Sequence, residues 1–309
     1  MNSSIAQPTP PIPGATELAG LEPIRTIKRR WPTLLGAGLS LLMVVGLGRE
    51  LFDRGLVGLT QAAPSSWIFY IFFAGVYLAG PTFDFIIYRK LWHIPWSGMV
   101  ALHRKRIAND VVLGYSGEAY FYAWARQRTQ MVAAPFGAVK DVSILSAMAG
   151  NAITLLLFAL ALPFAGELLT PAQYKTGLVS AAIIIAMSLP FLLLSRRVFS
   201  LERGELWHVF AVHCARLVVG SIFVACAWHF AMPEVSIGMW LLLAAARMLV
   251  SRLPFVPNKD LLFANFAIIM IGQGAALSEM LAFMAALTLL MHVVLIAAFG
   301  LIGLATKEI

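Results

Sequence analysis

A stretch with two prolines and two charged residues, residues 253–260, interrupts a long apolar region of the chain. Apolar arms flank it at about 236–251 and 261–276, and each arm has about 16 residues. A helix needs about 20 residues to cross the hydrocarbon core of a membrane. Backbone broken by prolines finds no hydrogen-bonding partner in lipid. The pattern therefore predicts a helical hairpin that enters the membrane, turns inside it and leaves on the same side, as at the substrate sites of many transporters.

The composition of the chain is that of a membrane protein. Hydrophobic residues make up 60% of its 309 residues and charged residues only 12%, and its mean hydropathy is +0.82. These values exclude a soluble domain and predict an all-α polytopic membrane protein. The net charge of +8 does not indicate nucleic-acid binding, because most basic residues stand in short loops that orient membrane helices.

The remaining apolar segments are long enough to cross the membrane. We predict about six spanning helices, together with two broken, re-entrant elements at about 97–127 and 236–276. A disordered cytoplasmic tail at 1–31 precedes a single transmembrane domain at 32–305. The basic end of that tail resembles a secretory signal, but we expect an uncleaved first helix. The predicted spans are at about 32–49, 66–88, 142–164, 176–195, 206–230 and 278–304.

Basic residues alternate between the loops and predict the topology. The segments at 25–30, 103–106 and 196–203 are read as loops rich in Lys and Arg, whereas the loop at 49–54 and the loop around Lys175 are only sparsely basic. By the positive-inside rule, both termini are cytoplasmic. This topology places the two broken elements on opposite sides of the membrane, which suggests an inverted repeat of the kind found in secondary transporters.

Arg216 and Arg247 are expected near the middle of the membrane, each about eleven residues into its apolar helix. An arginine there costs roughly 2.5–3.5 kcal/mol on insertion scales unless it faces protein or water. One interpretation is a cationic site for a lipid phosphate, which a guanidinium matches with two parallel hydrogen bonds. The alternative is an internal ion pair, for example with Asp260.

The tip of the predicted hairpin holds Lys259 and Asp260, which are candidate contacts for a lipid headgroup. Asp260 either caps the N-terminus of the second arm through its side-chain oxygen or is a titrating carboxylate that couples proton movement to transport. Asn265 and Gln273 in the second arm are candidate path-lining residues, or they bridge helices through hydrogen bonds.

Glu118 opens an aromatic run that includes Trp124. It is either a headgroup-contacting acid beside aromatic walls, with Trp124 lining the path, or part of a helix start, where the helix dipole favours an acid. Asp84, near the end of the second predicted span, is a further path-lining candidate. The alternative for Asp84 is an ion pair with Arg89 or Lys90.

The chain shows no catalytic motif and no cofactor site. His208 and His213 point to different faces of one helix, and Glu205 with His208 lacks the second copy that a carboxylate-bridged metal site needs. No phosphate-binding loop, dinucleotide fingerprint or nucleophile elbow is present. Cys214 and Cys226 are about 18 Å apart along one predicted helix, which is too far for a disulfide. We therefore expect no metal and no cofactor.

Two motifs carry a resemblance to a known family. Gly117 and Glu118 match a glycine-glutamate element, and residues 254–260 stand where a proline-glycine turn precedes an acidic residue, with other residues in place of the glycines. Over most of residues 32–305 the chain resembles the flippase-like family found in the transmembrane half of lysylphosphatidylglycerol synthases, the multiple peptide resistance factors. The resemblance implies a bacterial cytoplasmic membrane and movement of a polar lipid between leaflets.

We accordingly expect a lipid translocase, not an enzyme, that moves a polar or phosphate-bearing lipid between leaflets. Its expected partner is a membrane lipid and not a nucleic acid, with a homo-oligomer and a complex with a lipid-synthesis enzyme both left open. One alternative is a polyprenyl-dependent or other lipid-dependent glycosyltransferase that uses Glu50 and Asp53 as acid or base. The other is a non-catalytic membrane subunit of an envelope lipid pathway.

Overall fold

The computed structural model describes residue 45 and residues 63–112, 115–128, 134–161, 171–193, 198–252, 259–272 and 274–306. All regular elements in these ranges are α-helices, as predicted. Four of these helices are long and apolar enough to cross a membrane, so the chain is an all-α polytopic membrane protein. The tail at 1–31 and, apart from Val45, the expected first span at 32–49 lie outside the described residues.

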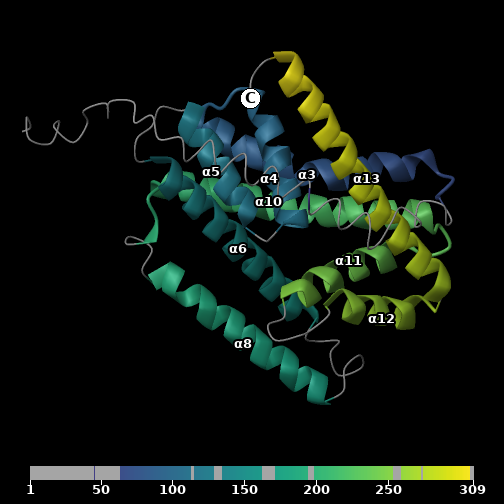
Figure 1. Cartoon of the computed structure of the whole chain (residues 1–309). Coiled ribbons are helices and arrows are strands. Elements are labelled where there is room, and N and C mark those ends of the chain that lie inside the picture. The colour runs from purple at the N-terminus through teal and green to yellow at the C-terminus, as the bar shows by residue number, and fades with distance from the viewer. Residues whose placement is uncertain are drawn as a thin grey trace, which may run out of the picture.

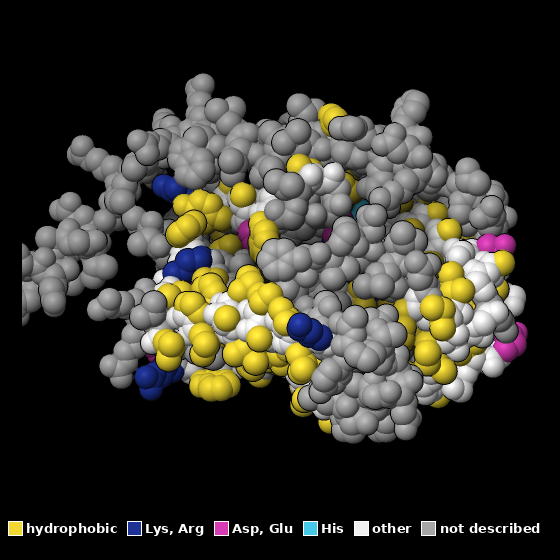
Figure 2. Space-filling model, turned by 90° about the horizontal axis from the view of Figure 1, so that it is seen from below, with side chains coloured by type: hydrophobic (Ala, Val, Ile, Leu, Met, Phe, Trp, Pro, Cys, Tyr) yellow, Lys and Arg dark blue, Asp and Glu magenta, His cyan; other side chains and the backbone are white. Residues whose placement is uncertain are grey.

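The described helices follow one another as shown in Figure 1. The candidate spans are α3, α6, α10 and α13. Hydrophobic side chains cover much of the described surface in Figure 2, as expected for helices that face lipid. The bounds are α3 (Trp67–Trp92), α4 (Gly98–Val111), α5 (Ser116–Arg128), α6 (Ala134–Ala161), α8 (Pro171–Leu193), α10 (Arg203–Ala231), α11 (Ile237–Arg252), α12 (Lys259–Ile271) and α13 (Gly274–Thr306).

The same order of elements occurs twice along the chain. A long helix, two short helices and a second long helix follow one another in α3–α4–α5–α6 and again in α10–α11–α12–α13. In both sets the two short helices pack on each other, and the first of them packs on the preceding long helix (Figure 1). The two broken elements predicted from the sequence are therefore the helix pairs α4–α5 and α11–α12. Their opposite orientation in the membrane stays a prediction.

The long helices α3 and α10 pack side by side at the centre of the fold. Phe72 of α3 stacks on Phe230 of α10, with ring centroids 5.6 Å apart, and it also contacts Phe223 at 6.1 Å. Without a hydrophobic driving force between helices in lipid, such close van der Waals packing holds spans together. The contact fixes the relative position of two of the helices that line the site described below.

The turn between α4 and α5 brings these helices very close together. The Ser116 hydroxyl donates a hydrogen bond to the carbonyl oxygen of Ala108 at 2.8 Å, and the Gly117 amide donates to Asn109 Oδ1 at 2.7 Å. A Cβ atom on Gly117 would collide with the backbone carbonyl of Lys105. The close approach therefore requires glycine at position 117.

The basic run at 103–106 is not the loop that the charge pattern predicts. It forms the middle of α4, in which His103 and Lys105 are buried. The prediction was wrong because clustered basic residues were read as a loop, whereas Lys105 meets a carboxylate of α3 that offsets the cost of burying its charge.

The helix α6 begins at Ala134, well before the predicted start near 142. Its first turns contain Lys140 and Asp141, whose charges do not suit a membrane span. Asp141 is fully buried, and its Oδ2 accepts hydrogen bonds from the backbone amides of Ser200 at 2.5 Å and Leu201 at 2.9 Å. The early turns of α6 thus hold the segment that leads into α10.

The predicted membrane hairpin corresponds to α11 and α12, which pack against each other. Its turn at 253–258 lies outside the described residues. The second arm ends at Ile271 instead of 276, because Gly272 adopts a left-handed conformation with φ of 75° that terminates the helix. The last span accordingly starts at Gly274, earlier than predicted.

Candidate functional site

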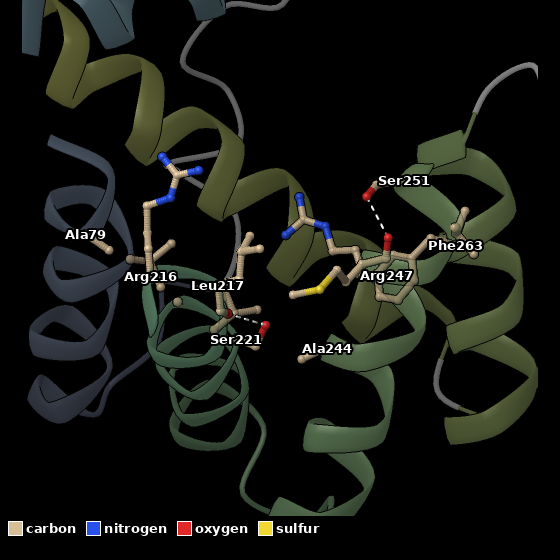
Figure 3. Close-up of a pocket in the computed structure, with 13 residues that line it drawn as sticks. Ala79, Arg216, Leu217, Ser221, Ala244, Arg247, Ser251 and Phe263 are labelled. Atoms are coloured by element: carbon tan, nitrogen blue, oxygen red, sulfur yellow. Dashed lines mark hydrogen bonds between the residues drawn. The ribbon is translucent and has the colours of Figure 1, made fainter. Parts of the chain in front are cut away.

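A pocket between α3, α10, α11 and α12 contains both arginines that the sequence places in the membrane. Its volume is about 390 Å³, within the range of roughly 300–1,000 Å³ that small-molecule sites have. Figure 3 shows Arg216 extending from α10 and Arg247 from α11, with their guanidinium groups on the same side of the pocket. Apart from Ser221 and Ser251, the other lining residues are apolar or glycine.

The two serine hydroxyls of the pocket bond to their own helices. Ser221 Oγ donates to the carbonyl oxygen of Leu217, and Ser251 Oγ donates to that of Met248 (dashed in Figure 3). Among the lining residues, the arginines therefore supply the positive charge and most of the donors that a ligand can reach.

Arg216 lies in the middle of α10, thirteen residues after Arg203 and fifteen before Ala231. Its Nη1 is 3.4 Å from Asp84 Oδ1 of α3, and its Nη2 donates to Ser146 Oγ of α6 at 2.8 Å. Its side chain remains 22% exposed. The arginine is thus shared between a buried polar network and the pocket.

Asp84 does not pair with Arg89 or Lys90, so the ion pair predicted as the alternative is wrong. Its Oδ2 lies 2.6 Å from Lys105 Nζ and its Oδ1 faces Arg216. Arg89 donates instead to the carbonyl oxygen of Ile94 at 2.6 Å. Side chains five and six residues apart lie on different faces of a helix, whereas those three or four apart meet. Asp84 therefore points into the bundle.

Lys105 is shared by two carboxylates, because its Nζ also lies 3.5 Å from Glu118 Oε1. Burial alone lowers the pKa of Lys105, but the charges of Asp84 and Glu118 outweigh burial and raise this pKa above the ordinary value for lysine. Lys105 is therefore charged at neutral pH. With Arg216 it balances the two carboxylates, so these four groups carry no net charge when both acids are ionised.

Some atoms of this network have no hydrogen-bond partner within the described part of the chain. They are Glu118 Oε2 and the hydroxyl of Tyr88, whose ring lies 5.9 Å from Lys105 Nζ. His213 is buried close to the same charges. Buried polar atoms are normally paired with protein or ordered water, so the network retains unused capacity for hydrogen bonding.

Arg247 has a different environment from Arg216. Its Cζ lies 6.0 Å from the ring centroid of Trp228, a distance at which a cation is attracted to an aromatic face. No carboxylate with a described side chain forms an ion pair with Arg247. The side chain of Asp260, the alternative partner predicted for Arg247, is not described. An ion pair between Arg247 and Asp260 therefore stays a prediction.

Glu118 and Trp124 do not line the pocket. Glu118 stands in the first turn of α5, where the helix-start interpretation places it, and it also pairs with Lys105. Trp124 packs on Phe121, with ring centroids 5.5 Å apart, and lies against the start of α4 at Gly98. The aromatic run thus joins α4 and α5, and its role in a lipid path stays a prediction.

The side chains of the remaining predicted site residues, which lie in or next to α12, are not described by the structure. Lys259 begins α12 and Asp260 follows it, as expected for the start of the second arm. The side chains of Lys259, Asp260 and Asn265 are not described, and Gln273 lies outside the described residues. Their contacts with a headgroup or with other helices stay predictions.

Lys105 and Ser146 were not predicted as partners of the site. A carboxylate such as Asp84 within an apolar span requires a buried cation, and that requirement was the available signal. Cys214 and Cys226 are both free thiols. Among the described residues, no group of three His, Cys, Asp or Glu side chains is arranged to hold a metal ion.

Comparison with known proteins does not identify the chain. No protein-family model matches it, and no curated protein or solved structure is significantly similar to it. The resemblance to the flippase-like family stays a prediction from the two motifs described above.

Proposed function

We propose that this chain binds a lipid with a phosphate-bearing headgroup inside the membrane and moves that headgroup between leaflets. The observation that supports this proposal most is the pocket in which Arg216 and Arg247 face one space among apolar side chains. The proposal agrees with the lipid translocase expected from the sequence.

The energetics of the two arginines support an anionic ligand. A mid-membrane arginine costs roughly 2.5–3.5 kcal/mol on insertion scales unless it is compensated. The ion pair of Arg216 with Asp84 is long, at 3.4 Å, and its other described hydrogen bond goes to the neutral hydroxyl of Ser146. Among described side chains, Arg247 has the ring of Trp228. A phosphate gives each guanidinium an ionised acceptor for short, parallel hydrogen bonds.

The position of the pocket favours a lipid over a soluble anion. Arg216 stands at the middle of a candidate span, and the lining around it is largely apolar. A phosphate at the arginines would therefore lie at the depth where a crossing headgroup most needs compensation. The apolar lining would contact the part of the lipid next to the phosphate.

Reconstitution into liposomes tests the proposal. A fluorescent phosphatidylglycerol is placed in one leaflet, and its redistribution is followed while mass spectrometry measures the lipid species. The protein should speed redistribution without changing lipid mass. Arg216→Met and Arg247→Met should abolish this effect, and Arg→Lys should leave part of it because lysine keeps the charge but lacks the planar fork. Arg203→Met, at an exposed position of the same helix α10, is the matched control.

Normal redistribution by a folded Arg216→Met, Arg247→Met double variant would end the proposal. Formation of a new lipid species, abolished by Glu50→Ala or Asp53→Ala, would establish the glycosyltransferase alternative instead. Glu50 and Asp53 lie outside the described residues.

A further inference from the structure

Arg216 is the residue through which the buried network reaches the pocket. It lines the pocket, whereas Asp84, Lys105, Glu118 and Ser146 do not. Its side chain is also more exposed than those of its partner Asp84 and of Lys105 behind it, at 22% against 10% and 9%. Whatever binds in the pocket therefore meets the network at this guanidinium.

The two ion pairs of Asp84 are unequal. Lys105 Nζ approaches Asp84 Oδ2 to 2.6 Å, while Arg216 Nη1 stays 3.4 Å from Oδ1. The longer contact is the weaker one and lies nearer the pocket. Asp84 can therefore lose Arg216 and still keep a close, charged partner, so the loss would not strand a buried carboxylate.

From this arrangement we infer that Asp84 is an exchangeable counter-ion of Arg216, which holds the guanidinium in the empty pocket and yields it to an incoming phosphate. The inference rests on the proposed function and deepens it by assigning a role to a residue outside the pocket. Asp84 acts through Arg216 and is a positioning residue that need not touch the lipid.

The charge of Asp84 should also speed the release of a lipid phosphate from Arg216. Its negative charge repels a phosphate bound at Arg216 and competes for the same donors, so it weakens binding and speeds departure. A transport site must bind its cargo firmly enough to load it and weakly enough to let it go. An arginine pair without Asp84 would hold the phosphate too long to turn over quickly.

The test compares binding and release on the same purified variants, with short-chain phosphatidylglycerol as the probe and short-chain diacylglycerol as the probe without phosphate. Asp84→Asn should bind phosphatidylglycerol on the order of tenfold more tightly, since it removes one nearby negative charge, and should redistribute it more slowly. Diacylglycerol binding should not change. Asp141→Asn is the matched control, because Asp141 is a buried carboxylate of α6 whose Oδ2 accepts from the amides of Ser200 and Leu201 and not from Arg216.

A second variant keeps the test valid if Asp84→Asn does not fold. Asp84→Asn with Lys105→Met removes one charge of each sign, so the balance within the network is kept. Tighter binding and slower redistribution in this double variant would support an effect of the local contact and exclude one of net charge. A purely structural role for Asp84 would lower stability without tightening phosphate binding.

The outcomes separate the inference from the function on which it rests. If Arg216→Met abolishes phosphatidylglycerol binding but both Asp84 variants bind it as weakly as the unaltered protein, or more weakly, counter-ion exchange is wrong and the phosphate site stands. If the folded Arg216→Met, Arg247→Met double variant binds normally, the phosphate site itself is wrong.

Discussion

Lys105 Nζ and Asp84 Oδ2 lie 2.6 Å apart, and neither side chain is more than 10% exposed. The pair joins α4 to α3, and so connects a short charged helix to a membrane span. A buried pair of this kind contributes little compared with an apolar pair, but breaking it leaves one uncompensated charge.

Lys105→Met or Asp84→Asn alone should therefore lower the free energy of unfolding by up to roughly 3–5 kcal/mol, because each leaves a buried charge without its closest partner. The double variant should recover most of the loss. Thermal unfolding in detergent measures both effects. Single variants as stable as the unaltered protein would show that water or Glu118 compensates the remaining charge.

Acid should destabilise the fold through His103 of α4. Burial, reinforced by the charge of Arg106, lowers the pKa of His103 from 6.5 to about 4. Between these values the unfolded chain binds more protons, so the stability from this group is complete above pH 6.5 and falls as the pH drops toward 4. The loss reaches about 3 kcal/mol at the lower end.

His103→Gln is the variant that isolates this effect. Unfolding measured between pH 7 and pH 4.5 should depend less on pH in the variant, because glutamine does not titrate. An unchanged pH dependence would assign the acid sensitivity to other groups.

Gly117→Ala should destabilise the α4–α5 pair by about 1–3 kcal/mol, the usual range for an overpacked contact. The new methyl group would meet the Lys105 carbonyl and Asn109 Oδ1, so the two helices must separate. Gly204→Ala is the control, since nothing lies within 4 Å of a Cβ there. Equal thermal stability of the two variants would contradict the tight packing.

Cysteine labelling tests the predicted orientation in a variant without Cys214 and Cys226. Ser278 is exposed at the start of α13, whereas the neighbouring Leu277 is buried and would not serve as a probe. Ser278→Cys should react with an impermeant reagent outside the cell. Glu202→Cys, exposed before α10, should react only after permeabilisation. The reverse pattern would place both termini outside.

Apolar length was sufficient to predict the described spans, and the proline break was sufficient to predict the pair α11–α12. The ends of helices were harder to predict where charged residues occur inside a helix. Asp141 lies within α6 and Lys105 within α4, although charged residues at both places had been assigned to loops or to positions outside a span. Both charges are buried because distant segments supply partners, the amides of Ser200 and Leu201 in one case and Asp84 in the other. Pairings over such separations follow from the tertiary fold and not from local spacing. The two arginines were predictable because a mid-membrane charge needs an explanation, whereas the identity of their neighbours was not.

In each of the two repeated sets, the last long helix packs on the first short helix of the other set. The last long helix of the first set, α6, packs on α11, and the last long helix of the second, α13, packs on α4. Each short helix pair is thus braced partly by the half of the chain to which it does not belong. A gene split between α8 and α10 should consequently yield two fragments that are each degraded when made alone, yet complement one another when made together.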